Sequence, residues 1–572
     1  MSHVRNPRLP VFRFGLVVVT IGLAMLALFA RAAYLQIWHS DYLQRQGNAR
    51  YLRVVSDAPY RGMIRDRNGE PLAISTPVES VWAQPDALAD ARSQWPMLAR
   101  KLGTSQAELA KLVQRHQGRE FMYLKRQVSP EFASGIIALN IPGVSTKREY
   151  RRYYPAGEAA GHILGFTNVD DVGQEGVELA YNDWLSGKAG RTRVLKDRLG
   201  NIVESVESIS LPEPGRDLVL SIDRRIQYLA YRELQQAVEQ HRAKSGTAVV
   251  MDVRTGEVLA MVNQPGFNPN NRKHLRSKYF RNRAVTDLFE PGSTLKPFTI
   301  AAALESGRFS PRSLIDTSPG AVLVGSKKIH DEHNFGWLSL TRVIEKSSNV
   351  GAAKVALQLG RQRIWDMLTR VGFGSGTESG LPGEVSGLIN PPEQWAKVDH
   401  ATISFGYGIS VTTLQLARAY AVIANGGYMV QPTLLRTDES KPGQRVLSDE
   451  LVHQLRYMLE RAAGAHGTGH AADIAHYRVA GKTGTVHKLI DGQYADDRYM
   501  GLFAGMVPAS NPRLVMVVTI NDPHRGGYFG GQIAAPVFRK VMSGALRLLN
   551  IPPDQPYKPG QQLVNTVLKE NA

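Results

Sequence analysis

Apolar and polar positions divide this chain into one membrane-length segment and two regions with globular patterns. Residues 14–30, FGLVVVTIGLAMLALFA, carry no charge and would extend about 25 Å as a helix at about 1.5 Å per residue. With the flanking residues up to position 34, the segment reaches the roughly 20 residues that cross a bilayer. The pattern therefore predicts one transmembrane helix at residues 14–34, after a short cytoplasmic tail at residues 1–13.

Charges around this segment predict its orientation. Arg5, Arg8 and Arg13 precede it, which favours a cytoplasmic N-terminus and an exported remainder. Arg31, on the other side, weakens this bias without reversing it. Two alternatives are a cleaved signal peptide, with Ala-Arg-Ala at residues 30–32 as the cleavage site, and a buried core helix. Because the apolar run is longer than a usual signal-peptide core, we expect a retained anchor.

The rest of the chain predicts two regions that meet near residue 215. Between residues 35 and 214, short β-branched runs alternate with helical stretches such as residues 105–116, and Pro and Gly turns separate them. A turn signal at residues 212–215 precedes a strand-like run at residues 218–222. Asp223 is then placed to cap a helix that continues to Gln240.

Strand patterns lie at both ends of residues 215–550, with helical patterns between them. Residues 247–253 and 258–263 predict two strands joined by a tight turn, and residues 502–520 predict further strands. Residues 535–549 predict a helix. This order predicts an α/β (α+β) domain in which an antiparallel sheet is flanked by helices. Residues 551–572 are expected to form a C-terminal tail.

Composition narrows the class of protein. A hydrophobic content of 43% with 21% charged residues is ordinary for a globular protein and excludes a polytopic membrane protein. The net charge of +18 favours an anionic neighbourhood or serves solubility. Zinc-finger spacing, an RNA-binding aromatic signature and long Lys/Arg blocks are absent, so we expect no nucleic-acid partner. The absence of cysteine excludes disulfides and thiolate catalysis.

Three short motifs follow one another in the second region: Ser293-Thr294-Leu295-Lys296, Ser347-Ser348-Asn349 and Lys482-Thr483-Gly484-Thr485. The turn before Ser293 predicts a helix beginning there, where free N–H groups favour an oxyanion, and Lys296 shares its face one turn later. A lysine whose pKa is lowered by burial or a second cation can take the proton of a serine hydroxyl. This predicts an acyl-transfer enzyme with a serine nucleophile. Alone, the first motif equally describes an exposed helix start.

The other two motifs can supply the remaining parts of such a site. Ser347 can place a hydroxyl near Lys296 and Asn349 an amide toward a substrate, ahead of a helical pattern at residues 350–359. The alternative is that these residues simply cap that helix. Lys482 can attract a carboxylate, and Gly484 lets a substrate approach the backbone after the strand-like run at residues 477–480. The alternative here is an ordinary strand with a turn.

Together and in this order, the motifs resemble those of the penicillin-binding protein and serine β-lactamase superfamily. Longer stretches resemble its class B members of the septal, FtsI-like type: NRAVTDLFEPGSTLKPF at 282–298, KSSNVG at 346–351 and FGYGISVTTLQLARAYAVIANGG at 405–427. RGMIRDRNG at 61–69 and RYYPAGEAAGHILGFTNVDDVGQEGVE at 152–178 resemble the family's elongated non-catalytic pedestal. The resemblance implies a dimerisation-type pedestal at residues 35–214 and a transpeptidase domain at residues 215–550.

The resemblance also implies an activity: D,D-transpeptidation in peptidoglycan cross-linking. Ser293 would attack the penultimate D-Ala carbonyl of a stem peptide with Lys296 as base, and Ser347 and Lys482 would help to move protons. The implied substrate-binding residues are Asn349, Thr483, Gly484 and Thr485. Backbone N–H groups of Ser293 and Thr485 would form the oxyanion hole.

Implied partners are stem peptides of lipid II-derived glycan, β-lactams, a SEDS-type glycan polymerase and division proteins. The implied location is the inner membrane, with the catalytic domain in the periplasm, and no cofactor is implied. A D,D-carboxypeptidase or β-lactamase would share every motif, and a β-lactam sensor or inactive scaffold would share the fold. Intact motifs argue against inactivity, and the single span leaves no evident signalling domain.

Two further patterns suggest ligands only weakly. His330 and His333 are three residues apart, and His466, His470 and His476 cluster later, but His-Glu-x-x-His is absent and the context is polar. The glycine-rich run at residues 372–376 lacks the lysine of a phosphate-binding loop. We therefore expect neither a metal nor a nucleotide.

Overall fold

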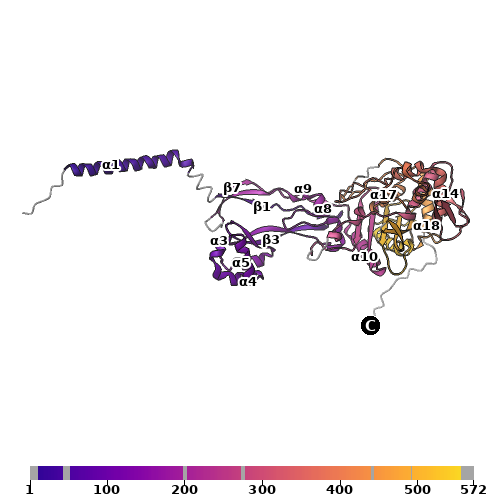
Figure 1. Ribbon diagram of the computed structural model, residues 1–572, viewed down its shortest axis with the longest axis horizontal. Coiled ribbons are helices and arrows are strands. Elements are labelled where there is room, and N and C mark those ends of the chain that lie inside the picture. The colour runs from indigo at the N-terminus through magenta and orange to yellow at the C-terminus, as the bar shows by residue number, and fades with distance from the viewer. Residues whose placement is uncertain are drawn as a thin grey trace, which may run out of the picture. The chain divides into compact units, whose positions relative to one another are not determined.

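The computed structural model describes residues 11–42, 52–196, 202–271, 277–437, 439, 443–490 and 492–555 (Figure 1). The chain divides into two compact units, neither continuous in sequence. The first comprises Met1–Tyr60, Pro77–Arg151 and Gly187–Pro214, and the second Arg61–Thr76, Arg152–Ser186 and Gly215–Ala572. Two segments before residue 215 thus fold with the second unit, and the limits at 35–214 and 215–550 stay predictions. Residues 1–10 and 556–572 of the two expected tails lie outside the described residues.

The expected membrane span forms helix α1 (Val11–Ala33), continued by a π-helical turn at Tyr34–Trp38. At about 1.5 Å per residue, 23 residues extend about 35 Å, enough to cross the roughly 30 Å hydrocarbon core of a bilayer. None of its residues is buried. A core helix would bury one face against other elements, so that alternative is wrong. The helix begins three residues before the expected position 14, because Val11 and Phe12 extend the apolar run past Arg13.

The first unit contains a three-stranded antiparallel sheet in the order β1-β6-β7 and a cluster of short helices with their own apolar core. The strands of this sheet are β1 (Leu52–Asp57), β6 (Gly190–Lys196) and β7 (Ile202–Ser210). The helices are α3 (Pro85–Asp90), α4 (Trp95–Leu102), α5 (Gln106–Arg115) and α6 (Pro130–Ile137). Helix α5 confirms the helix expected at residues 105–116, and Ser105 forms a capping box with Glu108 at its start.

Strands β3 (Pro71–Ala83), β4 (Met122–Val128) and β5 (Val144–Tyr153) belong to a second sheet, which also includes the two-residue strands β2 (Ile64–Arg65) and β8 (Leu218–Val219). The strand expected at residues 218–222 is therefore shorter than predicted, because only its first two residues pair with β2.

The second unit is built on a five-stranded antiparallel sheet in the order β10-β9-β17-β16-β15. Its strands are β9 (Ser245–Asp252), β10 (Val258–Gln264), β15 (Ala480–Ile490), β16 (Gln493–Val507) and β17 (Leu514–Asn521). Strands from the two ends of this region pair directly, with Val249 of β9 opposite Val517 of β17. The antiparallel sheet flanked by helices is thus confirmed.

Helices cover both faces of this sheet, which explains why its central strands read as continuous apolar runs. Val250 and Val518 pack in one core with α10 (Arg224–Gln240) and α20 (Ala535–Leu548). Val249 and Val517, one residue away on the same strands, pack in the other core with α17 (Thr413–Ala424). This alternation follows from the two-residue period of a strand. Asp223 caps α10 as predicted, since its carboxylate accepts a hydrogen bond from the N–H of Arg225.

The remaining elements of the second unit are short helices and two small hairpin-like sheets. The helices are α7 (Gly161–Leu164), α8 (Gly176–Ala180), α9 (Asn182–Ser186), α11 (Arg283–Thr286), α12 (Lys296–Glu305), α13 (Leu340–Glu345), α14 (Asn349–Leu359), α15 (Arg361–Arg370), α16 (Lys397–Ile403), α18 (Asp449–Ala463) and α19 (Gly530–Ile533). The strands are β11 (Leu314–Asp316) with β14 (Trp337–Ser339), and β12 (Ala321–Val324) with β13 (Lys327–His330).

A buried charge cluster ties together the two segments of the second unit that precede residue 187. Glu178 accepts hydrogen bonds from Arg61 Nε at 2.8 Å and Arg152 Nε at 2.6 Å. All three side chains are at most 1% exposed. Arg61 also donates to Asn182 Oδ1 at 3.1 Å and Ser186 Oγ at 2.7 Å. Buried charges are tolerated when they are paired and hydrogen-bonded in this way.

We expect Glu178→Gln to destabilise the protein, because it leaves two buried guanidinium groups without a carboxylate. Breaking a buried pair by removing one partner costs about 3–5 kcal/mol, so the thermal unfolding midpoint of the second unit should fall clearly. The matched control is Glu305→Gln, also in the second unit, which breaks an exposed pair with Arg370 (42% and 38% exposed) and should cost at most about 1 kcal/mol. Equal shifts in the two variants would contradict a structural role for the cluster.

Candidate active site

Ser293 lies in a 3-10 turn, Gly292–Leu295, that leads directly into α12. Close backbone approach makes this turn possible. Gly292 has φ +54°, and a Cβ there would come within 2.5 Å of Val486 Cγ2. A Cβ on Gly406 would meet the Gly292 carbonyl oxygen at 2.1 Å. The regular helix begins at Lys296 rather than at Ser293, and its first eight residues are buried, so the serine is presented by a fixed element.

The side chain of Lys296 is the hub of the site. Its Nζ lies 2.9 Å from Ser293 Oγ and 2.7 Å from Asn349 Oδ1. The same Nζ donates to the backbone oxygen of Ser347 at 2.5 Å and lies 3.2 Å from its hydroxyl. Lys296 is fully buried. The structure therefore brings the first two motifs together around one amine.

Burial and a neighbouring charge set the protonation of this amine. Desolvation is the main cause that lowers the pKa of Lys296 well below its ordinary value of 10.5, and the positive charge of Lys482 lowers it further. Burial also lowers the pKa of Lys482 to about 7, against a small opposing effect of Glu332. Both effects follow from disfavouring the charged form in a poorly solvated place beside a like charge. A neutral Lys296 can accept a proton from the Ser293 hydroxyl.

The second motif enters α14, and Ser348 is its N-cap, accepting a hydrogen bond from the Gly351 N–H at 2.8 Å. Within this motif, Ser348 caps the helix, as the alternative predicted, whereas Ser347 and Asn349 are the residues that contact Lys296. Ser347 takes a left-handed conformation, φ +60°, which is uncommon for a residue other than glycine. Its hydroxyl and the amide of Asn349 both reach Lys296.

Asp331 holds this helix start in place and was not identified from the sequence. Its carboxylate accepts hydrogen bonds from Ser348 Oγ at 2.5 Å, the Asn349 N–H at 2.5 Å and the Val350 N–H at 3.0 Å. In the sequence Asp331 stands between the histidines that were weighed as metal ligands. A carboxylate followed by a Ser/Asn helix start was the signal available, but a separation of 17 positions between Asp331 and Ser348 hides it.

The third motif lies within strand β15, not after a strand as expected. Ala480–Ile490 is paired with β16, and Lys482 is opposite Ala504. Of the strand predicted at residues 477–480, only Ala480 belongs to β15. The rest of the strand was missed because small or threonine residues follow Lys482, although all of them pair in the sheet. Strand β15 is last in the sheet order, so among the described residues one of its edges carries no partner strand.

The side chains of β15 have different hydrogen-bond partners. Lys482 is fully buried, and its Nζ donates to the Thr483 carbonyl at 3.2 Å. Thr483 Oγ1 lies 2.6 Å from Thr468 Oγ1, and Thr485 Oγ1 accepts from the Gly530 N–H at 3.1 Å. A Cβ on Gly484 would come within 3.1 Å of the Pro291 oxygen, so this glycine lets the strand approach the turn that carries the serine.

A groove of about 560 Å³ runs beside these residues, and Asn349 and Thr485 line it. Six Phe and Tyr side chains line it, which the sequence did not reveal because they come from strand β16 and from segments far apart in the chain: Phe405, Tyr407, Tyr494, Tyr499, Tyr528 and Phe529. Tyr494 and the Gly408 N–H both donate to Glu290, at 2.9 Å and 2.7 Å. Burial raises the pKa of that carboxyl group. The groove gives an extended ligand access to the free edge of β15.

Comparison with known proteins decides the family. The penicillin-binding protein transpeptidase domain matches residues 246–543, and the penicillin-binding protein dimerisation domain matches residues 56–220. The peptidoglycan D,D-transpeptidase FtsI of Escherichia coli K12 is 43% identical over 549 residues, covering 95% of this chain and 93% of that protein. The chain belongs to the penicillin-binding protein family.

Other relatives of this penicillin-binding protein agree with the assignment. The probable peptidoglycan D,D-transpeptidase PbpC of Pseudomonas aeruginosa is 42% identical over 543 residues, covering 95% of this chain and 96% of that protein. The crystal structure of penicillin-binding protein 3 from Mycobacterium tuberculosis, complexed with aztreonam, aligns with a TM-score of 0.68 at 29% identity. That alignment covers 88% of this chain and 99% of the other. The resemblance seen in the sequence is confirmed.

We expect Asp331→Ala to slow the reaction of Ser293 with a β-lactam about tenfold, because the start of α14 would no longer hold Ser347 and Asn349 against Lys296. Leaving the hydroxyl and N–H groups that donate to Asp331 unsatisfied costs about 1–3 kcal/mol of stability, so the fold should survive. Stopped-flow acylation and thermal unfolding measure the two effects. The control is Ser339→Ala, which removes the cap of α13, where Ser339 accepts from the Arg342 N–H. A similar loss of stability without slower acylation is expected there; equal acylation in both variants would contradict the role of Asp331.

Proposed function

We propose that this penicillin-binding protein is a serine D,D-transpeptidase that cross-links peptidoglycan stem peptides. The observation that carries the proposal is the buried Lys296 amine, 2.9 Å from Ser293 Oγ and 2.7 Å from the amide oxygen of Asn349. The relatives named peptidoglycan D,D-transpeptidases, which match nearly the whole chain, support the same reaction class.

In the proposed acylation, neutral Lys296 takes the hydroxyl proton while Ser293 Oγ forms a bond to the penultimate D-Ala carbonyl carbon. The negative charge that develops on the carbonyl oxygen is stabilised by the backbone N–H groups of Ser293 and Thr485. When the intermediate collapses, the C–N bond to the terminal D-Ala breaks, and the leaving amine takes a proton relayed through Ser347. The products are an ester on Ser293 and free D-Ala.

In the proposed second step, the amine of a neighbouring stem peptide attacks this ester. A proton passes from the amine to the site, an amide bond forms, and Ser293 Oγ regains its proton as the ester bond breaks. Before acylation, Thr483 and Thr485 bind the carboxylate of the terminal D-Ala of the donor peptide, which the charge on Lys482 attracts, and Asn349 donates to the donor backbone. The free edge of β15 aligns the donor as an added strand.

A D,D-carboxypeptidase would use water instead of an amine in the second step. The membrane-length helix α1 and the dimerisation domain at residues 56–220 favour the transpeptidase. We propose that the second unit acts in the periplasm at the division septum, beside a SEDS-type glycan polymerase and other division proteins. The arginines at positions 5, 8 and 13 support a cytoplasmic N-terminus by the positive-inside rule, and β-lactams that mimic D-Ala-D-Ala would acylate Ser293.

Fluorescent penicillin tests the nucleophile. The wild type should be labelled and Ser293→Ala should not, because the ester needs this oxygen. The control is Ser306→Ala, which follows the same helix and whose hydroxyl donates to the Ala303 carbonyl at 2.6 Å; its labelling should equal that of the wild type. Equal labelling of Ser293→Ala would refute the nucleophile. With lipid II and a partner polymerase, the wild type should give cross-linked stem peptides, whereas trimmed monomers alone would favour the carboxypeptidase.

The pH dependence of acylation tests Lys296 as the base. Below its folded-state pKa the amine carries a proton and cannot accept another, so the rate should rise with pH and level off far below 10.5. Glu332 lies in the groove and raises the pKa of both lysines. Glu332→Gln should therefore move the rising limb to lower pH, by a few tenths of a unit because the side chain is exposed.

Glu393→Gln is the control for this shift. It removes an exposed carboxylate that does not act on the pKa of either lysine, and it should leave the profile unchanged. A limb that moves equally in both variants would refute the electrostatic link between Glu332 and the base. A rate that keeps rising to pH 10 would refute the lowered pKa of Lys296.

A further inference from the structure

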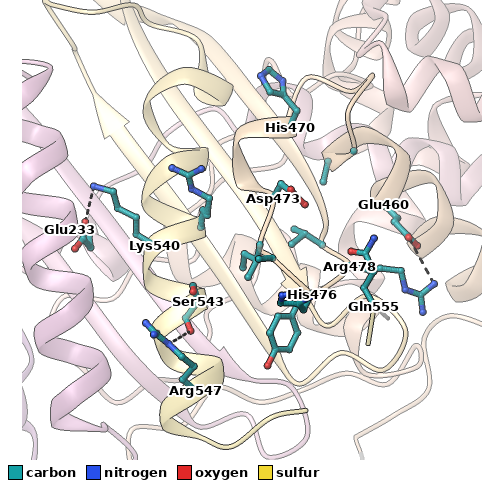
Figure 2. Close-up of a pocket in the computed structure, with 18 of the residues that line it drawn as sticks. Glu233, Glu460, His470, Asp473, His476, Arg478, Lys540, Ser543, Arg547 and Gln555 are labelled. Atoms are coloured by element: carbon teal, nitrogen blue, oxygen red, sulfur yellow. Dashed lines mark hydrogen bonds and ion pairs between the residues drawn. The ribbon is translucent and has the colours of Figure 1, made fainter. Parts of the chain in front are cut away.

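A second cavity of the catalytic unit, with a volume of about 1110 Å³, contains none of the motif residues and is about twice as large as the catalytic groove. Its walls are α10, α20, the end of α18 and the loop at residues 464–479 (Figure 2). Helices α10 and α20 touch closely here, since a Cβ on Gly544 would lie 2.3 Å from Leu229 Cδ2. The cavity is therefore built between fixed helices.

Cations outnumber carboxylates around this cavity. Three carboxylates line it, and two of them, Glu233 and Glu460, are paired within it. Lys540 lies 3.1 Å from Glu233, and Arg478 lies 3.9 Å from Glu460. The cationic side chains are Arg232, Arg478, Arg539, Lys540 and Arg547, and the carboxylates are Glu233, Glu460 and Asp473.

Two of the arginines that line the cavity are not paired with a carboxylate of the described residues. Within the described part of the chain, Arg539 has no hydrogen-bond or ion-pair partner, and Arg547 donates only to the Ser543 carbonyl at 3.3 Å. Ser543 lies midway between the two arginines, four residues from each. Figure 2 shows Ser543 and Arg547 along one helix, facing the side of the cavity that carries His476 and Asp473.

The spacing of these arginines fits a short extended peptide. Eight residues along α20 separate them, which is about 12 Å at about 1.5 Å per residue. An extended peptide advances about 3.3 Å per residue, so a four-residue peptide spans a similar distance, and carboxylates toward its two ends would meet both guanidinium groups. The cavity is also lined by small and aliphatic side chains: Leu229, Ala463, Ile474, Ala475 and Val479. Such a lining suits alanine side chains.

We propose that this cavity binds a second peptidoglycan stem peptide, distinct from the one that Ser293 attacks. The guanidinium groups of Arg539 and Arg547 pair with two of its carboxylates in the planar, two-pronged geometry that arginine favours. The proposal rests on the proposed function, because that function puts the protein beside alanine-containing, carboxylate-bearing peptides. The loop that lines the cavity also carries Thr468, which contacts Thr483 of the third motif, so the bound wall polymer stays next to the catalytic strand.

Binding is tested with the full chain in detergent after penicillin has acylated Ser293, so that the catalytic groove is blocked. A fluorescent disaccharide-tetrapeptide from peptidoglycan is titrated and its anisotropy measured. We expect Arg539→Gln/Arg547→Gln to bind about tenfold more weakly, because it removes two exposed arginine–carboxylate pairs, each of which contributes only modestly. The matched control, Arg312→Gln/Arg363→Gln, removes two exposed arginines outside the cavity and should bind as the wild type does.

Two ligand controls separate a peptide site from a general anion site. The same fragment with amidated carboxylates should bind at least about tenfold more weakly, and inorganic phosphate should compete poorly. Equal binding by the two double variants, equal binding of the amidated fragment, or displacement by phosphate at similar concentrations would each overturn the proposal.

Penicillin labelling of both double variants should match the wild type and thus report an intact catalytic unit. Failure of the proposed function would appear separately, as missing labelling or missing cross-links in the wild type. Loss of fragment binding in a fully labelled double variant supports the second site. Unchanged fragment binding in that variant would refute the second site.

Discussion

The contact on which this catalytic unit depends is a lysine amine buried among hydroxyl and amide oxygens. Lys296 has no exposed surface, yet its Nζ has oxygen partners from two separate motifs. Burial disfavours the charged form of the amine, and these oxygens satisfy its hydrogen bonds. The amine can therefore be uncharged and still have hydrogen-bond partners. The same environment that would make a lysine costly in an ordinary core suits this one to the base that we propose.

Much of the surrounding structure serves to keep that amine in place. Helix α12 is buried along its first eight residues, which fixes both ends of the Ser293–Lys296 pair. Asp331 fixes the start of α14, and glycines at positions 292, 406 and 484 let three backbone segments approach closely. Each of these features raises the conformational free energy locally, as the left-handed backbone of Ser347 does. The two apolar cores on either side of the sheet supply the stability that offsets these costs.

The sequence predicted the parts of this protein that depend on local pattern. Asp223 as a cap, the paired strands at the two ends of the catalytic region and the helix after Asn349 all follow from periodicity and capping chemistry over a few residues. The features that the sequence did not predict depend on contacts between residues distant in sequence. Asp331 reaches Ser348 across strand β14 and helix α13, and the groove gathers residues between 327 and 529. The third motif was placed after a strand because its small residues look like a turn. The sequence also did not predict that segments 61–76 and 152–186 belong to the second unit, because their contacts with it are distant in sequence.

That discontinuity has a kinetic consequence. Arg61 finds Glu178 only after 117 further residues, and at a synthesis rate of about 5–20 residues per second the guanidinium waits roughly 6–23 s for its carboxylate. The helices and strands at residues 77–151 are synthesised before Glu178, whereas the sheet β1-β6-β7 of the same unit needs residues up to 210. A folding order follows in which the part at residues 77–151 can form before the buried charge cluster does.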